Sequence, residues 1–157
     1  MFSAAKTKTG ADLTVQEAST IRDFMDVRRI RNECRDAMTH DQDVISRWKQ
    51  LGFWLYHARL GYVVYVFRCK GKAVAYGLIR TDHLGTEWIS GGVAAKERGK
   101  GYGLWLFGFL TAVVKKPGWL DVFAENLRAR VLYRKLGWLE LERLDTALGT
   151  IYVMTHD

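Results

Sequence analysis

A glycine-rich turn between an expected strand and an expected helix carries the clearest chemical signal in the sequence. Gly99, Gly101 and Gly103 stand at alternate positions, with Arg98 and Lys100 beside the first of them. Glycines lack a Cβ atom, so the backbone N–H groups of such a turn stay open to a ligand, and the N-terminus of the following helix adds a partial positive charge. The turn therefore predicts a site for an anion such as a pyrophosphate.

Two familiar nucleotide motifs do not account for this turn. The Gly-Lys-Ser/Thr that closes a P-loop is absent, and the third glycine and later acidic residue of a dinucleotide-binding turn are misplaced. The chain carries a net charge of +7, and nine of its 24 Lys and Arg residues lie between Lys96 and Lys135, with only three acidic residues. This local positive charge favours an anionic partner, either a phosphorylated cofactor or a nucleic acid.

A second segment combines an amide, a small residue and a phenol at helical spacing. Asn126, Ala129 and Tyr133 share one face of a helix that Asn126 caps and that Gly137 follows. The small residue leaves room for a ligand along this face. The alternative interpretation is an ordinary amphipathic helix with a capping Asn and a half-buried Tyr.

Apolar periodicity predicts the elements that position these segments. Strands are expected over residues 11–18, 62–68, 73–80, 87–95, 119–124, 139–144 and 150–155. Helices are expected over 20–34, 44–60, 102–115 and 126–136, and the third of them is so apolar that burial is expected. Gly91-Gly92 predicts a bend or bulge. Three consecutive strands imply antiparallel pairing and the later strand–helix–strand unit a parallel pair, so the fold class is α/β with a mixed sheet.

The composition predicts one globular domain over residues 1–157, with 1–11 as a flexible N-terminal segment. The chain is 48% hydrophobic and 26% charged and has one Pro, which excludes a low-complexity protein. Cys34 and Cys69 fit no ligand spacing and are expected to be free thiols in a reducing compartment. No signal peptide or membrane span is predicted, because the longest apolar stretch, 101–114, is too short. We therefore expect a soluble, cytoplasmic protein.

Together the two motifs resemble those of the GNAT family of N-acetyltransferases. The family's Gln/Arg-x-x-Gly-x-Gly/Ala turn is matched by Arg98, Gly101 and Gly103, and the valine that ends the preceding strand by Val93. The family's Asn-x-x-Ala-x-x-x-Tyr-x-x-x-Gly-Phe/Trp segment is matched by Asn126, Ala129, Tyr133, Gly137 and Trp138. The resemblance extends from about Leu13 to the end of the chain, and the expected order of elements agrees with it.

The resemblance implies that acetyl-CoA binds between two parallel strands that splay apart, here 87–95 and 119–124. The backbone of Val93 and Ala95 would hold the pantetheine, Gly99 to Gly103 the pyrophosphate, and Asn126 the pantetheine arm. No metal is implied. The implied cofactor-binding residues are Val93, Ala95, Arg98, Gly99, Lys100, Gly101, Tyr102, Gly103, Asn126 and Ala129.

The implied chemistry is attack of a neutral amine on the thioester. Because an alkyl amine has a pKa near 10.4, a general base is useful. Glu87, six positions before Val93, is the first candidate for this base, and His83 is the second; the alternative for Glu87 is an ordinary exposed strand carboxylate. The Val93 N–H would stabilise the oxyanion, and Tyr133 would protonate the CoA thiolate.

The resulting hypothesis is an acetyl-CoA-dependent N-acetyltransferase whose acceptor is a primary amine on a small metabolite, such as an amino sugar. Arg31-Asn32, Met38-Thr39 and Trp48 resemble acetyltransferases that act on amino-sugar nucleotides. Two alternatives stay open: acetylation of a macromolecular amine, on a protein or a modified nucleic acid, and a non-catalytic acyl-CoA-binding module. A nucleic-acid partner is the less favoured because the basic residues cluster at the expected cofactor site.

The acceptor side is less well specified. Some of four aromatic residues are expected to line it, namely Trp48, Phe53, Trp54 and Tyr56. The oligomeric state stays open between a monomer and a homodimer that uses the final strands as an edge.

Overall fold

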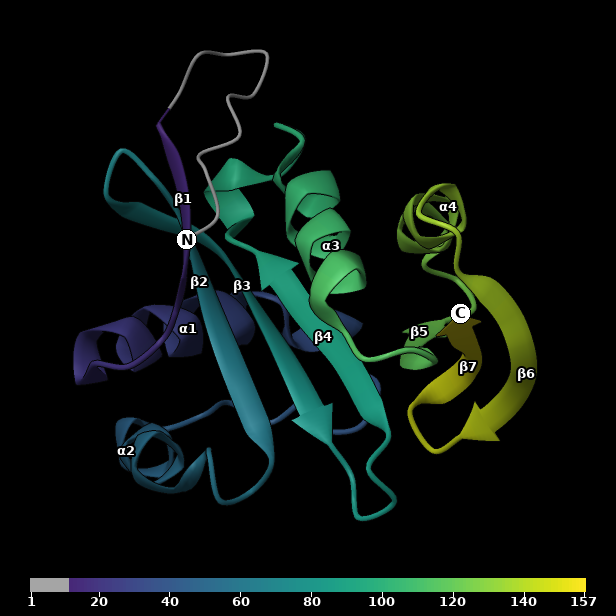
Figure 1. Ribbon diagram of the computed structural model, residues 1–157, viewed down its shortest axis with the longest axis horizontal. Coiled ribbons are helices and arrows are strands. Elements are labelled where there is room, and N and C mark those ends of the chain that lie inside the picture. Colours follow the sequence, from purple (N-terminus) through teal and green to yellow (C-terminus); the bar gives the residue numbers. More distant parts are fainter. Residues whose placement is uncertain (1–11) are drawn as a thin grey trace.

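The computed structural model describes residues 12–157, so the segment expected to be flexible, 1–11, lies outside the described residues. Within 12–157, seven strands form a sheet in the order β1-β2-β3-β4-β5-β7-β6 (Figure 1). The strands are β1 (Leu13–Glu17), β2 (Tyr62–Cys69), β3 (Lys72–Thr81), β4 (Glu87–Val93), β5 (Gly118–Phe123), β6 (Leu139–Thr146) and β7 (Gly149–His156). The helices are α1 (Ile21–Glu33), α2 (Arg47–Tyr56), α3 (Tyr102–Val113) and α4 (Leu127–Lys135), with short 3-10 turns η1 (Arg35–Ala37) and η2 (Ala95–Glu97). The expected order of elements and the mixed α/β sheet are confirmed.

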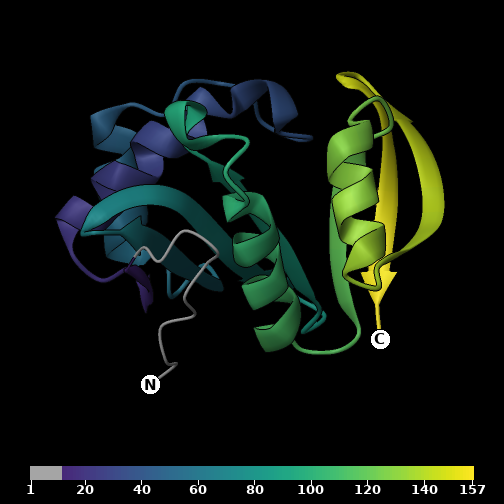
Figure 2. The same ribbon diagram turned by 90° about the horizontal axis from the view of Figure 1, so that it is seen from above.

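The strands β4 and β5 lie side by side only where they begin. They form the parallel pair of the sheet, and its register joins Glu87 to Gly118 and Trp88 to Trp119. Beyond these two pairs the strands separate, and the half of the molecule that holds β5, β6, β7 and α4 stands apart from β1–β4 (Figures 1 and 2). The backbone of the remainder of β4 therefore faces a gap instead of a neighbouring strand.

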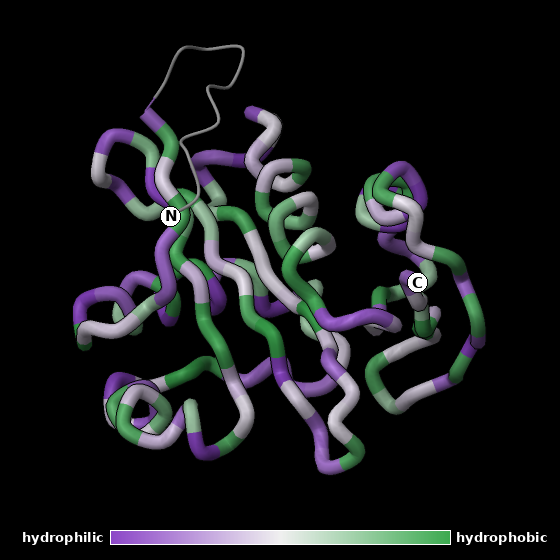
Figure 3. Tube along the Cα trace, in the orientation of Figure 1, coloured by the Kyte–Doolittle hydropathy of each residue, from purple (hydrophilic) through white to green (hydrophobic). Residues whose placement is uncertain are grey.

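Helices cover both faces of the sheet and define two hydrophobic cores. On one face, Phe24, Val27 and Ile30 of α1 pack against β2 and β3. On the other face, Leu106 and Leu110 of α3 pack against strands from both halves of the sheet. Figure 2 shows α1 and α2 on the side of the sheet opposite α3, and Figure 3 shows the hydrophobic residues along the central strands and α3. Strand side chains alternate between faces, so one sheet serves both cores.

Helix α3 is less buried than its composition predicts. Leu106, Phe107 and Leu110 are its buried residues, whereas Leu104 is 53% exposed. The expectation of a buried helix holds only for the side of α3 that meets the sheet. No helix within 12–157 is long and apolar enough to span a lipid bilayer.

The glycine pair of β4 does not form a bulge. The β3–β4 register runs unbroken from Ala75 opposite Val93 to Thr81 opposite Glu87. The two glycines instead admit close neighbours, since a Cβ atom on Gly91 would lie 2.6 Å from the Tyr76 carbonyl oxygen. A Cβ atom on Gly92 would lie 2.6 Å from the Cys34 sulfur. The predicted bulge is wrong, and close packing explains the glycines.

The segment between α1 and α2 is longer than expected because α2 begins at Arg47 and not at Val44. Ser46 caps α2, with its Oγ atom accepting a hydrogen bond from the Lys49 N–H at 3.1 Å. The Asn32 side chain bonds both backbone groups of Ile45, accepting from its N–H at 2.9 Å and donating to its carbonyl at 3.1 Å. Ile45 is thereby fixed as part of a loop instead of a helix.

A buried carboxylate fixes the start of α1. The Asp23 side chain accepts hydrogen bonds from the N–H groups of Ser19 and Thr20 at 3.1 and 3.2 Å and pairs with Arg68 at 2.9 Å. Thr20 Oγ1 in turn accepts from the Asp23 N–H, which completes the capping box that Thr20 and Asp23 suggest. Burial raises the pKa of Asp23, but these hydrogen bonds outweigh it, so the pKa lies below its ordinary value.

We expect Asp23→Asn to lower the free energy of unfolding by about 3 kcal/mol at pH 7, because a buried ion pair loses one partner. Because the pKa of Asp23 is lower in the folded state than in the unfolded state, where it is near 3.9, the ionised carboxylate stabilises the fold above that pH. This stabilisation is lost as the pH falls through the pKa of the folded state. The deficit of the variant should therefore shrink between pH 7 and pH 3 in chemical denaturation. Asp26→Asn is the matched control, since Asp26 also pairs with Arg68, at 3.0 Å, but is more exposed. Equal losses in both variants would contradict the special role of Asp23.

Candidate functional site

A cavity of about 750 Å³ occupies the space where β4 and β5 part. Its wall takes residues 88–93 of β4, residues 120–122 of β5, the N-terminal half of α3, α4 and the loop that follows α1. Residues predicted from sequence and found in this wall are Val93, Arg98, Gly99, Gly101, Tyr102, Gly103, Asn126, Ala129 and Tyr133. Three other predicted residues, Glu87, Ala95 and Lys100, lie outside the wall.

The glycine turn has the open backbone that its sequence predicts. Gly99 and Gly101 have φ angles of +80° and +88°, and a Cβ atom on either would meet nothing within 4 Å. Backbone conformation, not crowding, thus requires glycine here. Gly101 is also the N-cap of α3, which has no side-chain cap. The first N–H groups of α3 therefore remain available to an anion in the cavity.

Arg98 adds positive charge to the site and also connects its parts by hydrogen bonds. Its guanidinium donates to the carbonyl of Val93 at 3.4 Å and to the carbonyl of Glu33 at 3.1 Å. It also donates to the sulfur of buried Cys34 at 3.5 Å. Arg98 thereby joins the glycine turn to the end of β4 and to the end of α1.

Two predicted residues of the same segment have protein partners. The Ala95 N–H donates to the Glu33 carboxylate at 2.7 Å, so η2 is tied to α1. The Lys100 ammonium pairs with Glu97 at 2.8 Å, and Lys72 pairs with the same carboxylate at 3.4 Å. The Lys100 ammonium is the main cause that holds the pKa of Glu97 below its ordinary value.

Helix α4 places an amide and a phenol in the cavity wall. Asn126 caps α4, with Oδ1 accepting from the Ala129 N–H at 3.2 Å, as expected from the sequence. The amide nitrogen of Asn126 and the hydroxyl of Tyr133 have no hydrogen-bond partner among residues 12–157. Both groups are therefore free to bond a molecule in the cavity.

The Tyr133 ring is packed in the protein interior, and this packing positions its hydroxyl. Tyr133 is 8% exposed, and its ring meets Phe107 of α3 edge-on at 4.9 Å between centroids. Burial raises the pKa of Tyr133, and the Asp121 carboxylate raises it further. The phenol is therefore protonated at neutral pH and can donate a proton or a hydrogen bond.

The last two residues of the second motif, Gly137 and Trp138, have structural roles. Gly137 ends α4 with a φ of +91°, and a Cβ atom there would lie 2.9 Å from His156 Nε2. Trp138 is buried, and its indole N–H donates to Thr111 Oγ1 at 2.9 Å. These residues fix the direction of α4 and so place Tyr133.

Glu87 stands at the N-terminal end of β4, where the strands still pair. Its carboxylate accepts a hydrogen bond from the Lys115 N–H at 2.6 Å, so it joins β4 to the chain that leads into β5. His83, the second candidate base, is exposed in the β3–β4 loop. The structure brings neither residue to the cavity wall.

Sequence reasoning missed a polar cluster that does line the cavity. The Asp121 carboxylate on β5 bonds His40 Nε2 at 2.7 Å and accepts from Thr39 Oγ1 at 2.6 Å. The Asp121 side chain is 15% exposed and that of His40 is 74% exposed. A lone carboxylate within an apolar strand is the signal that could have identified Asp121.

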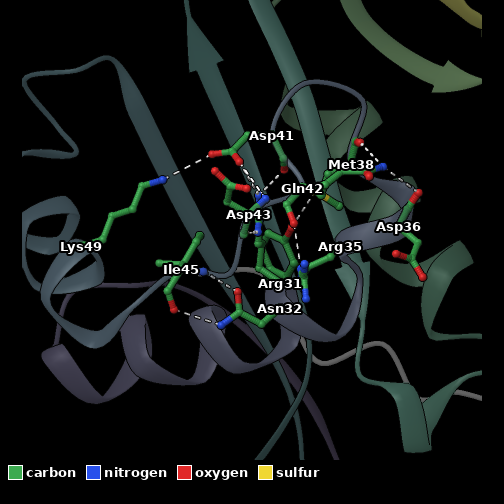
Figure 4. A network of polar contacts seen from close by, with 11 residues as sticks. Arg31, Asn32, Arg35, Asp36, Met38, Asp41, Gln42, Asp43, Ile45 and Lys49 are labelled. Carbon is green, nitrogen blue, oxygen red and sulfur yellow. Dashed lines mark hydrogen bonds and ion pairs between the residues drawn. The ribbon is translucent and has the colours of Figure 1, made fainter. Parts of the chain in front are cut away.

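A network of polar contacts positions the loop that carries Thr39 and His40 (Figure 4). Buried Arg31 of α1 donates to the carbonyls of Asp41 and Asp43. The Gln42 amide donates to the carbonyls of Asp36 and Met38 at 3.3 and 3.2 Å. The loop between α1 and α2 is therefore an organised wall of the cavity.

A second cavity, of about 280 Å³, adjoins the first between this loop, α2 and the α1-side face of β3. Both cavities share six wall residues, namely Arg31, Met38, Asp41, Leu78, Arg80 and Ser90. Of the four aromatic residues expected at the acceptor side, Phe53 lines this cavity. Trp48 is 82% exposed, Tyr56 is exposed, and Trp54 donates its indole N–H to the Ser19 carbonyl at 2.9 Å.

Cys34 and Cys69 are free thiols that form no disulfide. Among residues 12–157, no group of three or more His, Cys, Asp and Glu residues could hold a metal ion.

Comparisons with known proteins agree with this geometry. The model of the "Acetyltransferase (GNAT) family" matches residues 24–138, more than half of the chain. No curated protein matches the chain. A ribosomal-protein-alanine N-acetyltransferase from Brucella melitensis superposes with a TM-score of 0.78 at 19% identity, covering 91% of this chain and 98% of that one.

Two further structures were solved with cofactor. A protein from Salmonella typhimurium with its cofactor acetyl-CoA gives a TM-score of 0.77 at 18% identity, with 92% of each chain covered. A spermidine N-acetyltransferase from Vibrio cholerae, in complex with CoA and spermine, gives 0.73 at 14% identity, covering 92% of this chain and 94% of that one. At such identities the likeness establishes the shared fold.

Proposed function

The chain belongs to the GNAT acetyltransferase family, and from this premise we propose that it transfers the acetyl group of acetyl-CoA to a primary amine. The observation that carries the proposal is the separation of β4 from β5 after two residue pairs, with a cavity at the point of separation. Backbone along a strand without a neighbour can bond an extended ligand as an added strand would. The pantetheine arm of acetyl-CoA, which contains two amides, suits this edge.

The proposed orientation of acetyl-CoA follows the chemistry of the cavity wall. The pyrophosphate would lie against Gly99, Gly101 and the uncapped start of α3, where backbone N–H groups meet an anion. The Asn126 amide nitrogen would donate to the pantetheine arm, and Ala129 would leave space for it. When bound, acetyl-CoA supplies an acetyl group activated as a thioester.

Tyr133 is proposed to donate a proton to the sulfur that leaves. It lines the cavity on α4, and its hydroxyl has no partner within 12–157. Because its pKa is raised, the phenol carries its proton at neutral pH, which is the form that a general acid requires.

The amine must lose a proton before or during attack, and the protein offers two candidates to take it. Glu87 is the candidate predicted from sequence, and His40 held by Asp121 is the candidate supported by its place in the cavity wall. The imidazole is exposed while its Nε2 atom is fixed, so its other nitrogen can face solvent or substrate. We propose that the His40–Asp121 pair takes the proton.

We expect His40→Gln to lower kcat/KM by about 100-fold near neutral pH and to change its pH profile, as loss of a general base does. Glu87→Gln should leave the pH profile as in the wild type and change mainly stability, because it weakens the contact to the Lys115 N–H. The measurement is kcat/KM between pH 6 and pH 9.5 for the three proteins. A profile altered in Glu87→Gln and unaltered in His40→Gln would return the base role to Glu87.

We propose that the acceptor is a primary amine on a small metabolite, such as an amino sugar. The size of the second cavity, about 280 Å³, supports a small acceptor. The residues shared by both cavities support an approach from the α1–α2 side, opposite the α3–α4 side that would hold acetyl-CoA.

The test is release of free CoA thiol with a panel of primary amines, with mass spectrometry of each product. Acetylation of a small amine at a rate above that of thioester hydrolysis is the expected result. Acetylation of protein or nucleic-acid amines alone would assign a macromolecular acceptor. Binding of acetyl-CoA without transfer to any amine would indicate a non-catalytic module.

A further inference from the structure

Arg80 has no role in the chemistry described so far, although it lies where the two cavities meet. It lines both cavities from β3, where it pairs with Tyr62 of β2 and Trp88 of β4. The residue is half-buried. Among residues 12–157, its guanidinium has no ion pair and no hydrogen bond, even though Arg carries five N–H donors.

The other cations of the second cavity are engaged by the protein. Arg28 donates to the Ile45 carbonyl at 2.7 Å, Arg31 donates to two loop carbonyls, and Lys49 pairs with Asp41 at 3.3 Å. Asp41 is the one carboxylate in the wall of this cavity, against four cations. The cavity therefore has an excess of positive charge, and Arg80 is the cation whose donors are unassigned.

A half-buried guanidinium without a partner has lost part of its hydration without compensation. A carboxylate or phosphate oxygen pair matches the planar fork of Arg and would restore these interactions. The surrounding walls, which include Phe53, Tyr62 and Trp88, reduce access of water and strengthen such a pair.

Distance along the sheet limits the size of the ligand. Side chains of Leu78 and Arg80 lie on the same face of β3, two residues apart, which corresponds to roughly 6.6 Å. Leu78 pairs with Ser90 of β4, and both residues line both cavities. An amine that reacts near this pair would be only a few bonds away from a group bound to Arg80.

We propose that Arg80 binds the anionic group of the acceptor, so that the substrate is a compact primary amine that also carries a carboxylate or a phosphate. This inference rests on the proposed acetyl transfer and narrows its substrate class. The positive cavity would also disfavour polyamines, which carry several positive charges and no anion.

The test compares two matched pairs of amines: an α-amino acid with its amide, and an amino-sugar phosphate with the free amino sugar. The wild type should acetylate the charged member of at least one pair at least 10-fold more efficiently. In Arg80→Gln, the KM for that member should rise about 10- to 100-fold, as expected for loss of a charged hydrogen-bonded pair, with kcat and the KM of the neutral member nearly unchanged. The pair that responds identifies carboxylate or phosphate.

Arg22→Gln is the matched control, because Arg22 is exposed on α1 and lines neither cavity. Acetyl-CoA binding, measured by thermal shift, should be the same in the wild type, Arg80→Gln and Arg22→Gln. Equal turnover of charged and neutral amines by the wild type would overturn the role of Arg80 and leave acetyl transfer intact. If no amine is acetylated, acetyl transfer itself fails, and calorimetric titration of the charged amines into the CoA-bound protein decides on Arg80. Binding that Arg80→Gln does not weaken would overturn the inference.

Discussion

Replacing Tyr133 with Phe is expected to lower kcat by about 100-fold or more, within the range typical of a lost general acid. The hydroxyl is the group removed, and it lines the cavity without a protein partner in 12–157. The ring remains, and its edge-on contact with Phe107 supports the fold equally well in the variant. Acetyl-CoA affinity should therefore stay within about two-fold of the wild type.

The loss should be specific to Tyr133 and to substrates with a poor leaving group. Tyr65→Phe is a suitable control, because burial also raises the pKa of Tyr65 but the residue lies outside both cavity walls. An aryl thioester, whose thiolate leaves without protonation, should restore much of the rate in Tyr133→Phe. Equal kcat for Tyr133→Phe and wild type with acetyl-CoA would remove the acid role from this residue.

Replacing Gly101 with Glu is expected to weaken acetyl-CoA binding by at least about 100-fold. The substitution puts a negative side chain at the uncapped start of α3, where the pyrophosphate is proposed to lie. It also strains the backbone, because Gly101 has a φ of +88°. A ligand at a concentration of 100 times its Kd stabilises the folded protein by about 2.7 kcal/mol. Loss of acetyl-CoA binding is therefore visible as loss of the ligand-induced rise in Tm.

Gly85→Glu separates the effect on the site from the effect on the backbone. Gly85 has a φ of +77°, and a Cβ atom there meets nothing within 4 Å, so the strain and the added charge match those of Gly101→Glu. It lies in the β3–β4 loop, outside both cavity walls. We expect a similar fall in intrinsic Tm in both variants and an unchanged acetyl-CoA shift in Gly85→Glu alone. A shift retained by Gly101→Glu would contradict the proposed pyrophosphate site.

Local spacing explains which parts of the site could be predicted from sequence. Asn126, Ala129 and Tyr133 reach one wall because a helix repeats every 3.6 residues, so three residues determine one face. Alternation and turn residues likewise predicted the order of elements along the chain and the antiparallel pairing of β2, β3 and β4, but not the place of β7 between β5 and β6. The parallel β4–β5 pair followed from the connecting helix α3.

Contacts between distant segments leave no local pattern in the sequence. His40 and Asp121 are 81 residues apart and meet because Arg31 and Gln42 shape the loop after α1. That path depends on backbone carbonyls, which have no sequence signature. For the same reason, the sequence could not show that Arg98 bonds carbonyls of β4 and α1.

Glu87 illustrates the opposite difficulty. The sequence predicts its place on β4, but not the contact of its carboxylate with the chain that follows α3. The Glu87 carboxylate accepts a hydrogen bond from the Lys115 N–H and lies outside the cavity wall, whereas the next residue, Trp88, also pairs with β5 and lines the cavity.

Calorimetric titration of the wild-type protein with acetyl-CoA tests the central claim most directly. We predict binding of about one acetyl-CoA per chain with a dissociation constant in the micromolar range, and loss of that binding in Gly101→Glu. Such a result would place the cofactor at the splayed strands and reduce the remaining question to the acceptor amine. Absence of binding to acetyl-CoA and to longer acyl-CoAs would contradict the claim, and the basic segment from Lys96 to Lys135 should then be tested against nucleic acid.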